Sequence, residues 1–148
     1  MGKAESHIEI ISRGVLIHRG RVLVCQNKRA GYYYLPGGHV EFDESAAQAL
    51  AREFDEECGL QVTAGDCVLV TEGHFDAGRA RHHELNLVFH VKPRGPTNLD
   101  GIQSRERKIV FEWADLASIV DLDLRPASMR AWLASGGRLG CQWVSEMH

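Results

Sequence analysis

GHVEFDESAAQALAREFDEECGL, residues 38–60, is the most informative segment of this 148-residue chain. The part from Ser45 to Ala51 is rich in alanine and predicts a helix, which we expect to begin near Glu44 or Ser45, with Ser45 as its N-cap. Gly59 is of a type that commonly ends a helix. Three acids occupy the last turns of this predicted helix: Glu53, Glu56 and Glu57.

The position of these acids is unfavourable for the helix alone. The macrodipole is already negative at a helix C-terminus, where stability favours Lys or Arg. Spacings of three and four residues also place the three carboxylates on nearly the same side, and like charges one turn apart repel by roughly 0.2–0.5 kcal/mol per pair. A divalent cation bound through oxygen is the simplest compensation, so the spacing alone predicts a cation site.

Further residues fall at fixed intervals around the glutamates. They are Gly38, Glu44, Arg52, Phe54, Gly59 and Leu60. The complete pattern, Gly-x5-Glu-x7-Arg-Glu-apolar-x-Glu-Glu-x-Gly-apolar, resembles the Nudix box of the MutT-like hydrolases at every defined position. The preceding Leu35-Pro-Gly also looks like the lead-in of that family, whereas outside residues 35–60 the resemblance is one of layout.

The resemblance implies an α/β (α+β) protein, a Nudix-type α/β/α sandwich with a mixed central β-sheet, formed by a single domain over residues 1–148. The hydrophobic pattern agrees, because β-rich stretches flank the helix on both sides. Strands are expected within residues 7–18, 22–25, 32–35, 61–75, 84–91, 108–113 and 141–144, with a break near residues 64–66, and helices near residues 114–117 and 126–134. Residues 76–81 and 92–107 are expected to be loops.

The resemblance also implies roles for the residues of the box. Glu56 and Glu57 would bind Mg²⁺, Glu53 would be a ligand or the base, and the carbonyl of Gly38 would be a further ligand. Arg52 would orient the catalytic glutamates, although an ordinary intrahelical ion pair with Glu56 explains it as well. Glu44 would support the site electrostatically or simply cap the helix. Mn²⁺ is a plausible substitute for Mg²⁺.

The chemistry of the family explains why such a cluster is needed. Hydrolysis of a nucleoside diphosphate linked to another group X requires water to attack an anionic phosphorus centre. Mg²⁺ neutralises and orients the diphosphate and lowers the pKa of bound water, and one glutamate can act as base. We therefore expect an active Mg²⁺-dependent pyrophosphohydrolase whose partner is a small nucleotide-containing diphosphate.

Family members often recruit one more acid from outside the box. The candidates are Glu72, Asp76, Glu84, Asp100 and Glu106. Glu84 is preferred, because in its predicted strand it shares a face with Asn86 and Val88. An exposed strand residue with no role is the alternative.

The sequence says less about substrate binding. Arg29 and Arg81 lie in basic loops and could contact phosphate, and Tyr34, in the run of tyrosines at residues 32–34, could stack on a base. Solvated loop charges and ordinary aromatic packing are the alternatives. The long loop of residues 92–107 is a plausible substrate lid.

Composition and charge indicate which partners and which cellular location to expect. The net charge of -3 does not favour nucleic acid as a partner, and no apolar run approaches the length of a membrane span. The N-terminus lacks a signal-peptide pattern, and four scattered cysteines favour reduced thiols in a cytoplasmic protein. A homodimer is compatible with the resemblance.

The sequence leaves three alternatives to the hydrolase. A Nudix-fold nucleotide-binding or regulatory module without catalysis would be expected to have lost box acids, and all of them are present here. An enzyme similar to isopentenyl-diphosphate isomerase would need additional Cys and His metal positions that the sequence does not show. A zinc protein using His82 and His83 would hold Zn²⁺ tightly.

Overall fold

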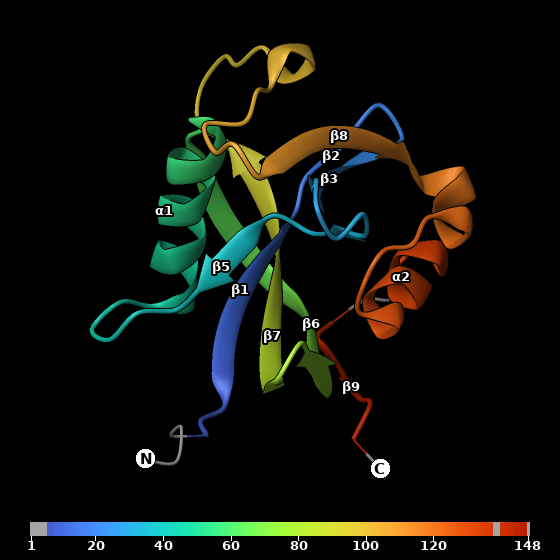
Figure 1. Ribbon diagram of the computed structural model, residues 1–148. Helices are drawn as coiled ribbons and strands as arrows, with labels where there is room; N and C mark the ends of the chain where they lie inside the picture. The colour runs from blue at the N-terminus through green and yellow to red at the C-terminus, as the bar shows by residue number, and fades with distance from the viewer. Residues whose placement is uncertain (1–5, 138–139, 148) are drawn as a thin grey trace.

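The centre of the protein is a mixed five-stranded sheet. The computed structural model describes residues 6–137 and 140–147, and its main sheet has the strand order β5-β1-β7-β6-β9 (Figure 1). These strands are β1 (Glu9–Val15), β5 (Gly37–His39), β6 (Val62–Ala77), β7 (Ala80–Pro93) and β9 (Gln142–Ser145). The β1–β7 and β6–β9 pairs are parallel, whereas β1–β5 and β6–β7 are antiparallel.

A smaller antiparallel sheet lies beside the main one. It contains β2 (Ile17–His18), β3 (Arg21–Asn27), β4 (Tyr33–Tyr34) and β8 (Ile109–Asp115), with β3 paired to each of the other three. The chain turns from β2 to β3 through Arg19 and Gly20, both at positive φ, as a tight two-residue hairpin requires.

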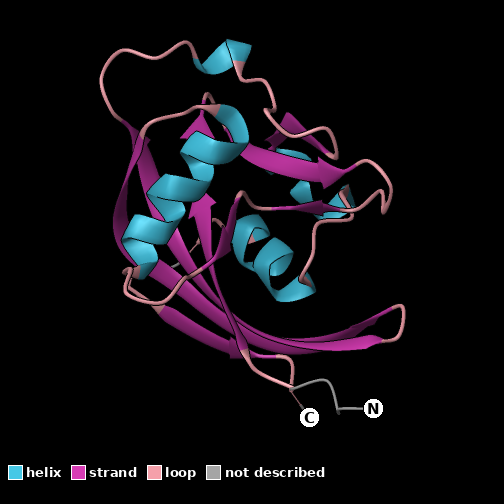
Figure 2. Cartoon of the chain, turned by 60° about the vertical axis from the view of Figure 1, so that its left-hand side comes forward, coloured by secondary structure: helices cyan, strands magenta, loops and turns pink. Residues whose placement is uncertain are grey.

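Helices cover both faces of the main sheet, as the predicted sandwich requires. The covering helices are α1 (Ala46–Cys58) and α2 (Ala127–Ala134), and two short 3-10 helices, η1 (Leu99–Gly101) and η2 (Leu116–Asp121), lie in connecting segments. Figure 2 shows α1 crossing the sheet on one side, while α2 lies within the concave side. The predicted α/β fold class with a mixed sheet is confirmed.

Alternation along the strands divides the core in two. Val15 and Val22 belong to the cluster that contains α2, whereas the adjacent Leu16 and Leu23 belong to the cluster under α1. Neighbouring strand residues point to opposite faces, so β3, β6, β7 and β8 each contribute to both clusters. Figure 1 shows the result, with the strands held between the two helices.

Two expected loops differ from the structure. Residues 76–81 were expected to form a polar loop, but β6 continues to Ala77 and β7 begins at Ala80, so that only a two-residue turn remains. Polar side chains are tolerated there because this end of the hairpin is exposed. The predicted break at residues 64–66 is a shift in pairing register before Cys67, which the strand absorbs without ending.

The long loop is also placed differently from expectation. The segment between β7 and β8 passes the C-terminal end of α1 (Figure 1), where the amide of Arg105 donates to the Glu57 carbonyl at 2.6 Å. Leu99 and Ile102 pack against the apolar cluster under α1. The loop therefore stabilises the C-terminal end of α1, and none of its residues lines the cavity described below.

Candidate active site

Both ends of α1 are capped as the sequence predicts. The Ser45 hydroxyl accepts from the amide of Gln48 at 3.1 Å, and the Gln48 side chain accepts from the amide of Ser45 at 2.8 Å. Gly59 adopts the left-handed conformation and its amide donates to the carbonyl of Asp55 at 2.9 Å. These caps fix the register of the helix, and with it the position of the acids in its last turns.

Two glycines allow the preceding loop to approach the helix. A Cβ at Gly37 would lie 1.9 Å from the carbonyl oxygen of Ser12, and one at Gly38 would lie 2.3 Å from Cδ of Glu53. Both distances are far below contact distance, so a side chain at Gly37 would collide with backbone and one at Gly38 would displace the Glu53 carboxylate. The Gly38 backbone therefore lies directly against the Glu53 carboxylate.

Arg52 connects the acids of the box. It forms a bidentate pair with Glu44 at 2.7 and 3.1 Å, and Nη1 donates to Glu53 at 3.0 Å and to Glu56 at 3.3 Å. Nη2 also donates to the carbonyl of His39 at 3.1 Å. The bond to Glu44 raises the pKa of Arg52 and lowers the pKa of Glu44, so both stay charged and hold the other carboxylates in place.

Glu57 is the acid that burial perturbs most. Its side chain is 7% exposed, and burial, with the nearby Glu53 charge, raises its pKa to about 8. Its Oε2 atom is buried and has no hydrogen-bond partner among residues 6–137 and 140–147. A buried, partnerless carboxylate oxygen is costly and fits a cation ligand, which supplies the missing partner.

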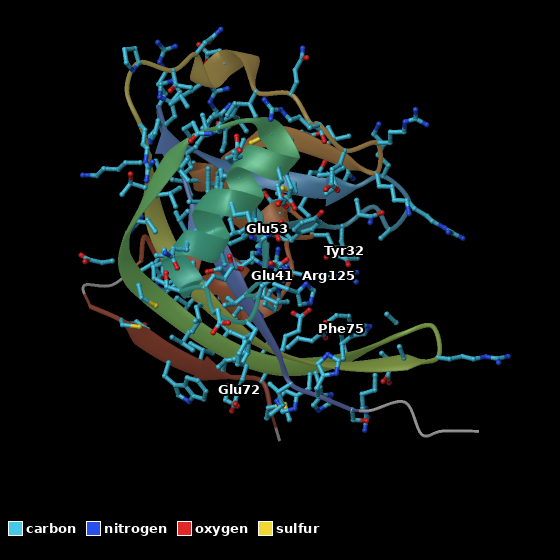
Figure 3. All side chains as sticks on the ribbon, turned by 90° about the vertical axis from the view of Figure 1, so that its left-hand side faces the viewer. Tyr32, Glu41, Glu53, Glu72, Phe75 and Arg125 are labelled. Carbon is cyan, nitrogen blue, oxygen red and sulfur yellow. The ribbon has the colours of Figure 1, made fainter. Side chains whose placement is uncertain are left out.

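A cavity of about 980 Å³ opens in front of these groups. Glu53, Glu57 and Gly38 line it together with Glu84 from β7. The cavity is also lined by Arg13, Tyr32, Tyr34, Phe75, Asn86, Asp123, Arg125, Arg130 and Glu146. In the view of Figure 3, Glu53 lies above Tyr32 and Arg125, and Phe75 lies below them on the β6–β7 hairpin.

The structure brings some of the predicted residues together. Glu84 lines the same cavity as Glu53 and Glu57, and it accepts a long hydrogen bond from Asn86 at 3.4 Å. Of the other acids considered outside the box, Asp76 also lines the cavity, whereas Glu72, Asp100 and Glu106 do not.

Other predicted residues lie away from the centre of the cavity. The Glu56 side chain is 56% exposed and is not among the lining residues. Arg29 and Arg81 are exposed and outside the lining, and Arg81 pairs with Asp76 at 3.4 Å, whereas Tyr34 does line the cavity. Within residues 6–137 and 140–147, no three acidic, His or Cys side chains are already arranged to hold a metal ion, since Glu53 and Glu56 turn toward Arg52.

Arg13, which was not predicted from the sequence, also belongs to the site. Its Nη1 donates to the carbonyl of Leu35 at 3.1 Å, its Nε donates to Asn86 at 3.4 Å, and its guanidinium lies 5.4 Å from the centre of the Tyr34 ring. Its charge acts to lower the pKa of Glu57 against the effect of burial. The signal in the sequence was a lone arginine within an apolar strand, where a charge needs a partner.

Comparison with known proteins agrees with this geometry. The NUDIX domain model matches residues 9–135. A putative 8-oxo-dGTP diphosphatase 2 from Mycobacterium tuberculosis is 32% identical over 147 residues, which cover 95% of this chain and 96% of that protein. The CTP pyrophosphohydrolase of Escherichia coli is 38% identical over 65 residues, 41% of this chain and 47% of that protein.

Solved structures show the same fold. The crystal structure of a MutT protein from Methanosarcina mazei matches with a TM-score of 0.68 and 24% identity, over 90% of this chain and 95% of that one. The chain therefore belongs to the Nudix family, and it is a hydrolase acting on acid anhydrides in phosphorus-containing compounds. None of its described helices has the length and apolar character needed to cross a membrane.

Proposed function

We propose that the protein is a Mg²⁺-dependent hydrolase that cleaves the pyrophosphate bond of a nucleoside diphosphate linked to another group X. The observation that carries the proposal concerns Oε2 of Glu57, which has no hydrogen-bond partner in the described part of the chain and is buried at a cavity that Glu53 and Glu84 also line. Three carboxylates around one cavity are a suitable oxygen donor set for Mg²⁺, or for Mn²⁺ in its place.

Different residues of the site would bind the cation and accept the proton. Glu53, Glu56, Glu57, Glu84 and the carbonyl of Gly38 would hold the cation, and Glu53 and Glu56 would turn from Arg52 to reach it. Bound Mg²⁺ would neutralise the diphosphate and lower the pKa of its water. Glu53, which faces the cavity, is the proposed acceptor of the proton of the attacking water.

The rest of the cavity supports a nucleotide as substrate. Arg125 lies 4.7 Å over the ring of Tyr32 and is fixed by two hydrogen bonds to Asp123, at 3.1 and 3.0 Å. Phe75 also lines the cavity, and its ring stacks on the ring of His82 with the two ring centres 4.9 Å apart. Planar groups of this kind can stack on a base, and the relatives named for CTP and 8-oxo-dGTP agree with a nucleotide.

The proposal extends to the context of the protein. Residues 1–148 would act as one domain in the cytoplasm on small nucleotides, without nucleic acid or membrane as partner, and two copies would associate as a homodimer. Light scattering coupled to size-exclusion chromatography tests the dimer, and a mass of one chain at assay concentration would exclude it.

The test of activity is a product-identified screen of nucleoside triphosphates, sugar nucleotides and dinucleoside polyphosphates, with and without Mg²⁺. We expect nucleoside monophosphate to be released from at least one compound, only with the metal, and not by Glu57→Gln. Asp55→Asn is the matched control, because it removes a carboxylate from the same helix that does not line the cavity. Release of no product from any compound would favour the binding module without catalysis.

A further inference from the structure

Two cysteine thiols, far apart in sequence, meet at the edge of the main sheet. Cys67 belongs to β6 and Cys141 directly precedes β9, and their Sγ atoms are 3.8 Å apart. Cys141 is exposed and Cys67 is half-buried. A disulfide requires an Sγ–Sγ distance of about 2 Å, and the pairing of Leu69 with Gln142 holds the two backbones side by side next to the cysteines.

The strand next to Cys141 is weakly attached. Among the strands that the structure describes, β9 pairs with β6 alone, from Leu69↔Gln142 to Glu72↔Ser145. Its Trp143 side chain is 59% exposed, and Val144 is the β9 residue that packs partly against the core. A short edge strand with little buried apolar surface opens at low cost in free energy.

The residue after β9 reaches the cavity. The amide of Glu146 donates to the carbonyl of Glu72 at 2.9 Å, and Glu146 lines the same cavity as Glu53 and Glu57. The pairing of β9 with β6 therefore holds an acidic side chain at the cavity wall.

We propose that Cys67 and Cys141 are a modification site, at which a peroxide forms an intrachain disulfide that fastens β9 to β6. The exposed Cys141 thiolate attacks one peroxide oxygen, the O–O bond breaks, and a sulfenic acid and water result. The Cys67 thiolate then attacks this sulfur, the S–O bond breaks, and the hydroxide leaves as water. Two thiols are oxidised by two electrons in total, and one peroxide is reduced to two waters.

The other two cysteines provide internal controls. Cys25 is fully buried, and burial raises the pKa of its thiol well above the usual range. Cys58 is half-buried, its thiol donates to the carbonyl of Phe54 at 3.2 Å, and burial raises its pKa. Burial raises the pKa of Cys67 as well, so the exposure of Cys141 is what selects it as the thiol that meets peroxide, and Cys67 reacts because its Sγ lies beside that of Cys141.

The experiment treats the purified, reduced, full-length protein with hydrogen peroxide. Intact mass should fall by two hydrogen atoms, and a non-reducing peptide map should join the peptides of Cys67 and Cys141. Amide hydrogen exchange across Gln142–Ser145 should slow by about 10-fold or more. Cys141→Ser should abolish both effects, whereas Cys58→Ser should retain both.

Several results would overturn the proposal. Four thiols retained after treatment, oxidation to sulfinic acid without a cross-link, a disulfide between two chains, or a link that uses Cys58 would each exclude the site. A Cys67–Cys141 disulfide that leaves the amide hydrogen exchange of β9 unchanged would show that the disulfide does not hold β9 against β6. Because the readouts are mass and exchange, none of these outcomes depends on the proposed hydrolysis.

Discussion

At the residue scale, the guanidinium of Arg52 is shared by Glu44, Glu53 and Glu56. This planar group donates in several fixed directions at once, which a lysine ammonium cannot reproduce. Arg52→Lys should therefore keep the charge but lose the orientation of the carboxylates, and kcat should fall by about 10- to 100-fold. Steady-state kinetics at saturating Mg²⁺ measure this, with the exposed Arg105→Lys as control. An unchanged kcat would show that Arg52 is only a structural ion pair.

Glu57 links the site to stability. In the unfolded chain its carboxyl ionises near pH 4.5, whereas in the folded protein burial holds its pKa at about 8. Its contribution is thus most favourable below pH 4.5, falls as pH rises between these two values, and is constant above them. Glutamine cannot ionise, so Glu57→Gln should make the metal-free protein more stable than wild type above pH 8.

Urea unfolding in the presence of a chelator measures this difference. The variant should gain a few kcal/mol over wild type at about pH 8.5, and much less at about pH 5. The same substitution should abolish Mg²⁺-dependent turnover, because the cation loses a ligand. Equal stabilities at both pH values would contradict the burial of an ionisable Glu57.

The residues of the box could be predicted from sequence, because residues three and four apart lie on the same face of a helix. The different burial of the glutamates could not be predicted. Glu57 is buried and Glu56 is exposed, since the loop at Gly38 and the strand that carries Arg13 cover only one side of α1. Arg13 itself was missed, because its partners, Leu35 and Asn86, come from segments that only the folded sheet brings together.

At the element scale, the contact between the Gly38 loop and α1 should control activity. Gly38→Ala places a methyl group against the Glu53 carboxylate, so that either the loop or the carboxylate must move. We expect turnover to fall more than 10-fold, with a loss of stability of about 1–3 kcal/mol. Gly65→Ala is the control, since its added Cβ meets only a carbonyl oxygen at 3.4 Å. Normal kinetics in Gly38→Ala would show that this close approach is not needed.

The segment between β7 and β8 should act on stability rather than on the substrate. The Arg105 guanidinium donates to the carbonyl of Asp55 at 3.3 Å and packs over Gly59, at the end of α1 where helix carbonyls need donors. Arg105→Ala should lower the free energy of unfolding by about 1 kcal/mol and leave KM unchanged. Arg107→Ala, in the same segment, is the comparison. An increase in KM would restore the role of a substrate lid.

The order of the elements was predictable, because turn residues and apolar periodicity mark where each one begins and ends. Their lengths were less so. The β6–β7 hairpin extends well beyond its apolar part, since backbone pairing continues through polar residues as far as Ala77 and Ala80. Figure 2 shows this hairpin projecting from the sheet, and the cavity wall that contains Phe75 depends on that extension.

At the scale of the whole molecule, the cavity joins parts of the chain with different tasks. Glu53 and Glu57 come from α1 and Glu84 from β7, whereas Tyr32 comes from the segment before β4, Phe75 from the β6–β7 hairpin and Arg125 from the segment before α2. The box residues would act on the diphosphate, which all substrates of this class share. Changes in Tyr32 or Phe75 should therefore alter the choice of substrate without altering the chemistry.

Phe75→Ala tests this division directly. Phe75 has one face stacked on His82 and remains 44% exposed, so a base can stack on its other face. Loss of such a contact costs about 1–3 kcal/mol, and KM for the best nucleotide should therefore rise by about 5- to 100-fold with kcat nearly unchanged. Phe42→Ala is the matched control, because Phe42 is 95% exposed and lies outside the cavity. If kcat fell and KM did not change, Phe75 would belong to the reacting end of the cavity and the proposed division would be wrong.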